Sequence, residues 1–448
     1  MRAALAVMGG VVVVFAVFTG IRVWSTVHAI SPRAQLQDVI GLIQAQSDPG
    51  TLAYKVQHGQ RINVLLLGYG GPGHDGPYLT DSIMLLSINP ATHQAIMISL
   101  PRDLWVRIHA LPNNGYLTGK LNSAYAIGTD HTGYPNVAGK YQTNTGGGDL
   151  AAATVSQISG QPIDYWIGVD FKAFRDVVNA LGGVRIDVPT ALDDPYYPRG
   201  ETTGMMHIHF DPGWQTMNGE QALEYARSRE TTSDFDRSRR QQLIILAVRQ
   251  RVFSLNAVPR MFSLLSALSD NVRTNLRPQD MRELVSFAGE IKDQNIHRVA
   301  IDTSNFLRSG YSNDGQYILQ PLDPTYGALQ RLIAAALPDQ TVLTRPQAFQ
   351  VVDGSRSYWV PYGDGTPAAI TASLLQGIGL PATQGPVSPT RYLQSQILDG
   401  SAGKDPALVT WLQNYFGAAV TPVPPPATGP AITVIIGYNF NSKTFPVP

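Results

Sequence analysis

The chain has 448 residues with 44% hydrophobic content, which is typical of a folded protein of two or three domains. Lysine plus arginine and aspartate plus glutamate balance at 33 each, so no net charge favours nucleic acid, and we expect no nucleic-acid partner. The absence of cysteine excludes disulfides, cysteine-ligated zinc and thiol catalysis, and it suits an exported protein.

The N-terminus contains an uncharged apolar stretch over residues 3–21. About 19 apolar residues are enough for a transmembrane helix, whereas the apolar core of a cleaved signal peptide is shorter. We therefore predict a membrane anchor over residues 1–24, followed by a polar, partly helical stalk over residues 25–60. This predicts a single-pass protein of the cell membrane with the chain from about residue 25 outside the cytoplasm. A cleaved signal peptide ending near Ala29 is the alternative.

Three apolar segments open the first folded domain and are predicted to be strands: 62–67, 82–88 and 94–99. Asp81 comes directly before the second strand, and Arg102 and Asp103 follow the third. Charged side chains just past a strand end typically line a site in an open α/β sheet. If the second and third strands are antiparallel, Asp81 can meet Arg102. The alternative is that this pair is a structural salt bridge that closes a loop.

Strands and helices alternate in the next part of the chain. A glycine tract at 146–148 precedes a predicted helix, and the following strand, helix and strand are expected at 162–170, 171–181 and 184–188. This alternation predicts an α/β fold, which we expect to be a three-layer α-β-α domain with a central mixed sheet over residues 61–340. His207 and His209 alternate as in a strand, and we interpret them as structural or surface residues.

Residues 218–242 are rich in arginine and carboxylates. Asn218 is a good N-cap for a helix that we expect to end near Arg227 and Arg229, and a second helix is predicted to start at Ser233. The residues expected on one side of the second helix are Arg237, Arg240 and Gln241, and those expected on a buried face are Leu243, Ile244, Leu246 and Ala247. Arg251, at the far end, is expected to be a surface arginine.

A helix N-terminus beside several guanidinium groups is suited to a phosphate or pyrophosphate, because backbone N–H groups point outward and arginines bind two oxygens at once. Two alternatives are a solvated charged surface, which is the usual role of a charge run, and arginines that bind nucleic acid.

The character of the chain changes from about residue 345. The predicted strands are 348–352, 393–398 and 432–437, and the predicted helices are 366–378 and 406–416. They indicate a small C-terminal α/β domain over residues 345–442, with the Pro-rich link PVPPPATGP before its last strand. No catalytic set is evident there, so we interpret this domain as a binding or spacing module.

Seven motifs appear in the order seen in LytR-CpsA-Psr (LCP) proteins: TDSIMLLSINP, SLPRD, KLNSAYA, PIDYWIGVDFKAF, LGGVRIDVP, NGEQALEYARSR and DFDRSRRQQ. The resemblance extends from about residue 62 to about residue 337, and long motifs in register make it highly specific. VVDGS and AITVIIGYNF resemble, less specifically, the LytR C-terminal domain that follows LCP domains in some members.

The resemblance implies a membrane-anchored phosphotransferase that moves a glycopolymer from a polyprenyl pyrophosphate carrier to peptidoglycan. It also implies a divalent cation, usually magnesium (or manganese), and an apolar tunnel for the lipid. The predicted partners are therefore the polyprenyl pyrophosphate-linked glycan, peptidoglycan, and the membrane through the N-terminal helix.

The resemblance also implies which residues form the site. The expected catalytic residues are Asp81, Arg102, Arg227, Arg229, Asp234 and Gln241. The expected pyrophosphate-binding residues are Arg102, Lys120, Arg227, Arg229, Arg237 and Arg240. The expected metal ligands are Asp81 and Asp103.

Two positions depart from the family pattern. Many members carry an aspartate in the turn after the first strand, where this chain has Gly68-Tyr69-Gly70-Gly71, and Asp75 is a candidate substitute. The glycine expected in the D-[YF]-G-R motif is Asp236, which adds a carboxylate near the arginines. Two other functions stay open: a hydrolase that uses water as the acceptor, and a non-catalytic wall-binding scaffold.

Overall fold

The structure is a computed structural model that describes residues 51–198, 204–228, 234–254, 270–303, 305–338, 340–343, 346–355, 366–438 and 440. The described residues fall into two compact units. Of the described residues, the first contains those up to Ile296 except Asp103–Trp105 and Ser156–Gln161, and the second contains these two segments and those from His297 onward. The domain boundaries expected from the sequence stay predictions.

The predicted transmembrane span at residues 3–21 lies outside the described residues. Within the described part of the chain, which starts at residue 51, no helix combines the length and the apolar content that a membrane crossing requires. A short helix, α4 (Leu52–Gln57), begins at the N-cap Thr51, whose hydroxyl accepts a hydrogen bond from the Tyr54 amide.

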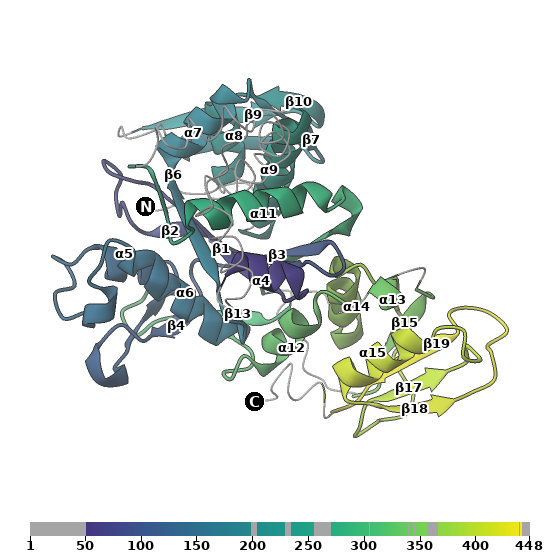
Figure 1. Cartoon of the computed structure of the whole chain (residues 1–448). Helices are drawn as coiled ribbons and strands as arrows, with labels where there is room; N and C mark the ends of the chain where they lie inside the picture. The colour runs from purple at the N-terminus through teal and green to yellow at the C-terminus, as the bar shows by residue number, and fades with distance from the viewer. Residues whose placement is uncertain are drawn as a thin grey trace, which may run out of the picture. The chain divides into compact units, whose positions relative to one another are not determined.

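The first unit is built around a mixed sheet that contains, in spatial order, β11-β6-β1-β2-β3 (Figure 1). The bounds are β1 (Ile62–Tyr69), β2 (Thr80–Asn89), β3 (Gln94–Leu100), β6 (Tyr165–Asp170) and β11 (Val272–Thr274). β1 and β6 are parallel, and the β1–β2, β2–β3 and β6–β11 pairs are antiparallel. The prediction of an α/β fold with a central mixed sheet is therefore confirmed.

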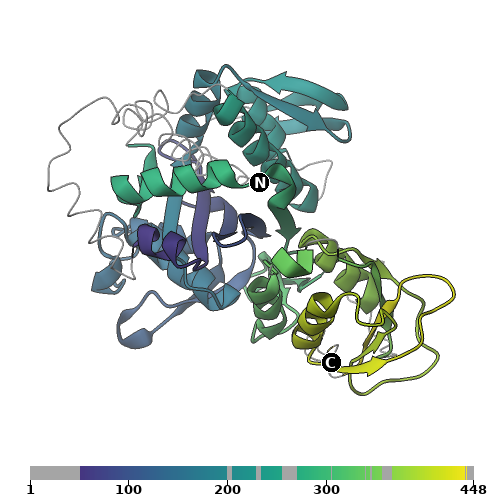
Figure 2. The same cartoon turned by 45° about the vertical axis from the view of Figure 1, so that its right-hand side comes forward.

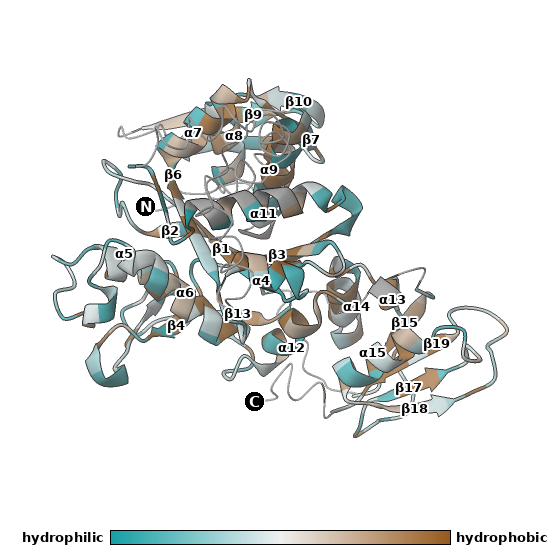
Figure 3. Cartoon of the chain, in the orientation of Figure 1, coloured by the Kyte–Doolittle hydropathy of each residue, from teal (hydrophilic) through white to brown (hydrophobic). Residues whose placement is uncertain are grey.

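The central strands are buried along nearly their whole length, and Figure 3 shows their apolar character in brown. Burial of both faces requires that other elements cover both sides of the sheet. Two helices, α5 (Ser123–Thr129) and α6 (Gly146–Ser159), pack on the face that carries Trp166, whose indole Nε1–H donates to Asp149 of α6 at 2.8 Å.

The predicted glycine tract is not a loop before α6 but its first turn. A Cβ atom on Gly148 would lie 2.1 Å from the Trp166 ring, so this position excludes any larger residue. The glycines therefore allow the helix to approach the sheet closely.

The opposite face of the sheet is covered by α9 (Asp234–Ser254). Trp166 shares its face with Leu85 through β1, whereas Ser99 of β3 lies opposite Met84 and so points to the other face. Ser99 accepts a hydrogen bond from the side chain of Gln242 on α9 at 3.0 Å. A further helix, α11 (Pro278–Glu290), lies beside α4 (Figures 1 and 2).

Six further elements of the first unit follow β6 in the sequence. They are α7 (Phe171–Ala180), β7 (Val184–Val188), β8 (Leu192–Pro198), β9 (Met205–Phe210), β10 (Gly213–Met217) and α8 (Gly219–Arg227). β8 and β9 form one antiparallel pair, β7 and β10 form another, and α8 packs on α7 and α9. Smaller elements are β4 (Trp105–Ile108), β5 (Leu117–Lys120) and the 3-10 helices η1 (Pro112–Asn114), η2 (Gly139–Tyr141) and η3 (Asp293–Asn295).

The second unit contains a sheet with the order β16-β15-β19-β17-β18. The bounds are β15 (Phe349–Asp353), β16 (Ala382–Gln384), β17 (Gln396–Asp399), β18 (Ala419–Pro422) and β19 (Ile432–Ile436). The helices are α12 (Gly327–Ala335), α13 (Gln340–Leu343), α14 (Pro367–Gly377) and α15 (Pro406–Phe416), and the strands β12 (Ile296–Ala300), β13 (Leu307–Tyr311) and β14 (Tyr317–Pro321) precede them. The three strands and two helices predicted for this region are confirmed, whereas the short edge strands β16 and β18 were not predicted.

Candidate active site

The antiparallel pairing of β2 with β3 brings Asp81 to Arg102. Ile83 lies opposite Leu100, so two steps further along the same register places Asp81 opposite Arg102. Arg102 Nη1 donates a hydrogen bond to Asp81 Oδ1, and both side chains are buried, each with 8% exposure. The predicted meeting of these residues is confirmed, although Asp81 lies inside β2 and not before it.

A β-bulge sets the direction of the Asp81 side chain. Gly68 of β1 pairs with Ser82 and Tyr69 pairs with Thr80, so Asp81 is the extra residue on β2. A bulge bends its strand and redirects the side chains beside it. The bulge therefore places Asp81 at an irregular end of the sheet, where regular pairing stops.

A loop after β5 is fixed against this pair through its backbone. The Asn122 amide donates to the Arg102 carbonyl at 3.1 Å, and the Asn122 carbonyl accepts from the Thr80 amide at 3.2 Å. Lys120, at the end of β5, comes two residues before this junction. The segment that carries Lys120 is therefore anchored beside Asp81 and Arg102.

Arg227 lies in the last turn of α8, a helix that starts with a capping box between Asn218 and Gln221. Its guanidinium carbon lies 4.7 Å from the centroid of the Phe171 ring and 5.0 Å from that of Tyr197. Burial lowers the pKa of Arg227, while the neighbouring Tyr197 and Asp81 side chains raise it. Arg227 is therefore a buried cation packed against two rings and within the field of Asp81.

Three side chains here hold buried donors that have no hydrogen-bond partner among the described residues. The donor atoms are Nε and Nη2 of Arg227, the hydroxyl of Tyr197 and Nε2 of Gln241. Burial raises the pKa of Tyr197, so its hydroxyl keeps the proton that it can donate. Unsatisfied buried donors are costly, and a ligand that accepts from all of them offsets that cost.

The two donors of Arg227 leave from the same edge of the planar guanidinium, so they can reach two oxygens of one phosphate. Gln241 is placed near Asp81 because its Oε1 accepts from the hydroxyl of Ser82 at 3.3 Å. The site thus combines the two donors of the Arg227 guanidinium, the neutral donors of Tyr197 and Gln241, and the Asp81–Arg102 pair. This combination is suited to a phosphate or pyrophosphate anion.

The family model of the LytR_cpsA_psr family matches residues 36–332. The chain belongs to this family. TagV of Bacillus subtilis (strain 168), a polyisoprenyl-teichoic acid–peptidoglycan teichoic acid transferase, is 31% identical over 221 residues, which are 48% of this chain and 50% of TagV. The chain therefore matches about half of the length of TagV. TagU of Enterococcus faecalis (strain ATCC 700802 / V583), which bears the same enzyme name, is 29% identical over 259 residues, or 56% of this chain and 73% of TagU.

Solved structures of related proteins are also similar to the chain. The crystal structure of B. subtilis TagV has 26% sequence identity and a TM-score of 0.46, and the match covers 61% of this chain and 96% of that one. TagT bound to LIIa-WTA has 26% identity and a TM-score of 0.44, with 61% and 89% coverage.

The arginines predicted on one side of α9 do share a buried side. Arg237, Arg240 and Gln241 are all buried. Arg240 donates from Nε to the Tyr225 carbonyl at 2.9 Å and from Nη2 to the Ser228 carbonyl, so it holds the C-terminal end of α8 next to Arg227. These bonds give Arg240 a positioning role, and direct contact with the pyrophosphate stays a prediction for it, as it does for Arg237.

Burial lowers the pKa of Arg240, whereas Tyr225 and then Asp236 raise it, so Asp236 does add a carboxylate near the arginines, as expected. The predicted buried face of α9 is partly wrong. Ile244 and Ala247 are buried, but Leu243 and Leu246 are half-buried. The expectation for Arg251 is also wrong, because its Nε donates to the Leu181 carbonyl at 3.0 Å from a half-buried position.

The roles of three predicted site residues stay predictions. Arg229 lies outside the described residues, as does the expected helix start at Ser233, and the side chain of Asp234 is likewise not described. Asp103 belongs by its contacts to the second unit, where its carbonyl accepts from the Leu319 amide at 2.9 Å. Its role as a metal ligand stays a prediction.

The residues around Asp81 fit magnesium only as an ion shared with the substrate. Magnesium usually binds through one or two carboxylates plus substrate phosphates. Among the described residues, no group of three acidic or histidine side chains gathers around Asp81. At the turn after β1, a Cβ on Gly71 would lie 2.9 Å from the Asp170 side chain, and Asp75 is exposed. Asp81 is therefore suited to one contact with an ion that phosphate oxygens also hold.

Sequence reasoning missed Phe171, Tyr197 and Asp194. Asp194 Oδ2 accepts from the hydroxyl of Ser228 at 2.6 Å and so fixes the residue after Arg227. Asp194 and Tyr197 come from β8, which is far from the arginine motifs in sequence, and no local pattern indicates their role. Phe171 is part of a motif in the resemblance, but an apolar residue at a helix start suggests only packing.

Proposed function

We propose that the chain is a membrane-anchored phosphotransferase that moves a glycopolymer from a polyprenyl pyrophosphate carrier to peptidoglycan. Family membership and relatives named as teichoic acid transferases support this proposal. The apolar stretch at residues 3–21 supports a single-pass anchor in the cell membrane, with the catalytic domain on its outer side.

One observation carries the proposal: the buried edge of Arg227, whose two donors have no partner among the described residues. A fixed cation of this kind is suited to a pyrophosphate, which presents several oxygens and high negative charge. Tyr197, whose ring packs on the Arg227 guanidinium, and Gln241, which is bonded to Ser82 next to Asp81, add neutral donors. Four unsatisfied donor atoms on three buried side chains favour an anionic ligand over a purely structural role.

In the proposed reaction, a peptidoglycan hydroxyl attacks the phosphorus that bears the glycan. The new phosphorus–oxygen bond forms as the bond to the bridging oxygen of the pyrophosphate breaks. The hydroxyl proton passes to solvent, and polyprenyl phosphate leaves with the bridging oxygen. Protein groups contribute by positioning and by charge stabilisation, because this chemistry needs little covalent help. Arg227 and Arg102 would stabilise the charge on the phosphate oxygens.

We also propose that magnesium (or manganese) acts at this site, with Asp81 as its protein ligand. The ion would neutralise phosphate charge and orient the leaving group. The support is the chemistry of the site: a buried carboxylate beside groups suited to phosphate.

The test is glycan attachment to peptidoglycan in a strain that depends on this protein, with protein levels checked by immunoblot. Asp81→Asn and Arg227→Lys should each lower attachment by about 10²–10³-fold, the usual effect of losing one preorganised charge partner. Arg239→Ala is the matched control, because Arg239 is an exposed arginine on α9. Normal attachment by both stable site variants would reject the transferase and favour a scaffold. Free glycan released into the medium at the wild-type rate, without attachment, would instead indicate a hydrolase.

A further inference from the structure

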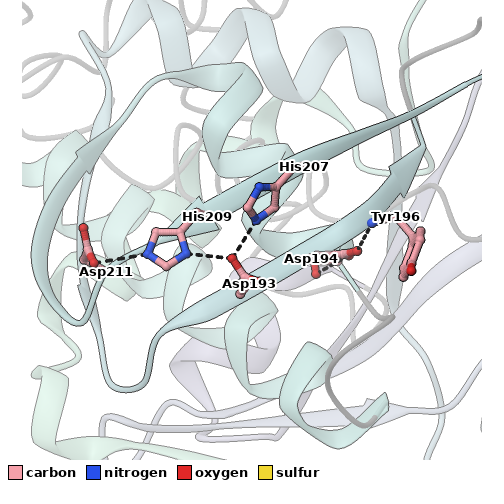
Figure 4. A network of polar contacts seen from close by, with 7 residues as sticks. Asp193, Asp194, Tyr196, His207, His209 and Asp211 are labelled. Atoms are coloured by element: carbon pink, nitrogen blue, oxygen red, sulfur yellow. Dashed lines mark hydrogen bonds and ion pairs between the residues drawn. The ribbon is translucent and has the colours of Figure 1, made fainter.

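The β8–β9 hairpin carries a second cluster of chemically active side chains (Figure 4). His207 Nε2 and His209 Nδ1 lie 2.7 Å and 2.9 Å from the same oxygen of Asp193. The ligand atoms of these three residues all lie within 4.8 Å of one another. No other group of three acidic or histidine side chains in the described part of the chain meets this criterion. All three side chains are exposed to solvent.

The register of the hairpin explains why they meet. Asp193 lies directly opposite His209, and His207 is two residues along the same strand, so the three share one face. The other face is buried and holds Leu192, Asp194, Ile208 and Phe210. Two residues of β8 oppose His207 at a bulge that starts after Asp194. The cluster is thus preorganised by backbone pairing, not by chance contact of long side chains.

We propose that Asp193, His207 and His209 bind one divalent transition-metal ion of the zinc type. Zinc takes imidazole nitrogen at about 2.0–2.1 Å and carboxylate oxygen at about 2.0–2.2 Å. Ligand atoms on one tetrahedral ion are therefore about 3.4 Å apart, so a small outward movement of exposed side chains admits the ion. Two imidazoles favour zinc over magnesium, which prefers oxygen ligands.

Asp211 supplies an independent indication of a metal site. Its carboxylate lies 3.2 Å from Nε2 of His209, on the side of the ring away from Asp193. Histidines that bind metal through one ring nitrogen almost always donate the other N–H to a carboxylate, carbonyl or water. Asp211 is therefore placed to fix the His209 ring and to strengthen Nδ1 as a ligand.

The proposed ion would stiffen the hairpin that supports Arg227. On the inner face, Asp194 accepts from the hydroxyl of Ser228, and the Tyr197 ring packs on the Arg227 guanidinium. A metal that joins β8 to β9 on the outer face fixes both strands together. The site is thus a structural one, separate from the phosphate-binding residues.

Equilibrium dialysis of the full 448-residue chain against zinc chloride, followed by elemental analysis, tests this proposal. The protein is prepared without a histidine tag and is first stripped with chelator. We expect one zinc ion per chain, retained in millimolar magnesium, and a higher Tm with zinc. His207→Gln and His209→Gln should each weaken binding at least tenfold, and Asp211→Asn should weaken it about 10–100-fold.

His93→Gln is the matched control, because His93 pairs with Glu290 on the surface at 3.0 Å and belongs to no group of three such ligands in the described part of the chain. This variant should bind zinc like the wild type. The proposal is wrong if the His207→Gln and His209→Gln variants, with unchanged circular dichroism, keep wild-type stoichiometry and affinity. It is equally wrong if millimolar magnesium displaces the zinc.

Discussion

At the scale of single residues, the Asp81–Arg102 pair has two separate consequences. Both side chains are buried, so each charge has lost most of its water and depends on its partner. The same carboxylate also acts on Arg227 through space. Substitution of Asp81 is therefore expected to change stability as well as transfer, and the two effects need separate measurements.

We predict that Asp81→Ala lowers the free energy of unfolding by about 3–5 kcal/mol, because it leaves the charge of Arg102 buried without its carboxylate. The double variant Asp81→Ala/Arg102→Met should recover most of this loss. Urea unfolding followed by circular dichroism measures both. Equal destabilisation by the single and double variants would contradict the account of the pair.

Tyr197 contributes a ring and a hydroxyl, and these can be tested separately. Tyr197→Phe keeps the ring beside Arg227 but removes the donor. We predict that it weakens binding of the pyrophosphate lipid by about 10–100-fold, as expected for a lost hydrogen bond to a charged group, while the Tm changes little. Titration of the purified chain with the lipid measures this effect. Unchanged affinity would show that the hydroxyl does not face the ligand.

At the scale of elements, arginines of α9 donate hydrogen bonds to the C-terminal ends of three other helices of the first unit. Arg240 donates to the last turn of α8, Arg251 to the C-cap of α7 at Leu181, and Arg249 to the C-cap of α11 at Ile291. Helix C-termini leave carbonyl groups unsatisfied and carry partial negative charge, so cations are favourable there. The arginines of α9 therefore set helix positions as well as charge at the site.

Arg251 provides a test of this role. We predict that Arg251→Ala lowers the free energy of unfolding by about 1–2 kcal/mol, because the Leu181 carbonyl loses a charged donor. Arg239→Ala, on an exposed position of the same helix, should stay within about 0.5 kcal/mol of the wild type. Chemical unfolding of the two variants under the same conditions measures this difference. Equal free energies of unfolding for the two variants would contradict the capping role of Arg251.

At the scale of the whole molecule, the sequence predicted most of the fold because its strong signals are local. Helix α15 begins and ends at the predicted residues, since a capping Asp405 and the glycine after Phe416 define it. The strands of the central sheet follow their apolar runs. The Asp81–Arg102 contact was expected on the condition that the second and third strands are antiparallel, and the structure meets that condition.

The sequence could not predict what depends on long-range contacts. The Tyr197–Arg227 packing joins β8 to α8, and the bonds of Arg251 join α9 to α7. The histidines of β9 were interpreted as structural or surface residues, because their meeting with Asp193 depends on the register of a hairpin. Tertiary pairing, and not local pattern, decides these positions.

Lipid that copurifies with the full chain tests the central claim, that the buried edge of Arg227 binds a pyrophosphate, most directly. Mass spectrometry should find polyprenyl pyrophosphate species with the wild type and with Arg239→Ala. Arg227→Lys should retain at least tenfold less, because lysine keeps the charge but cannot bind two oxygens from one edge. Equal amounts of this lipid with Arg227→Lys, in a variant of unchanged Tm, would contradict the claim.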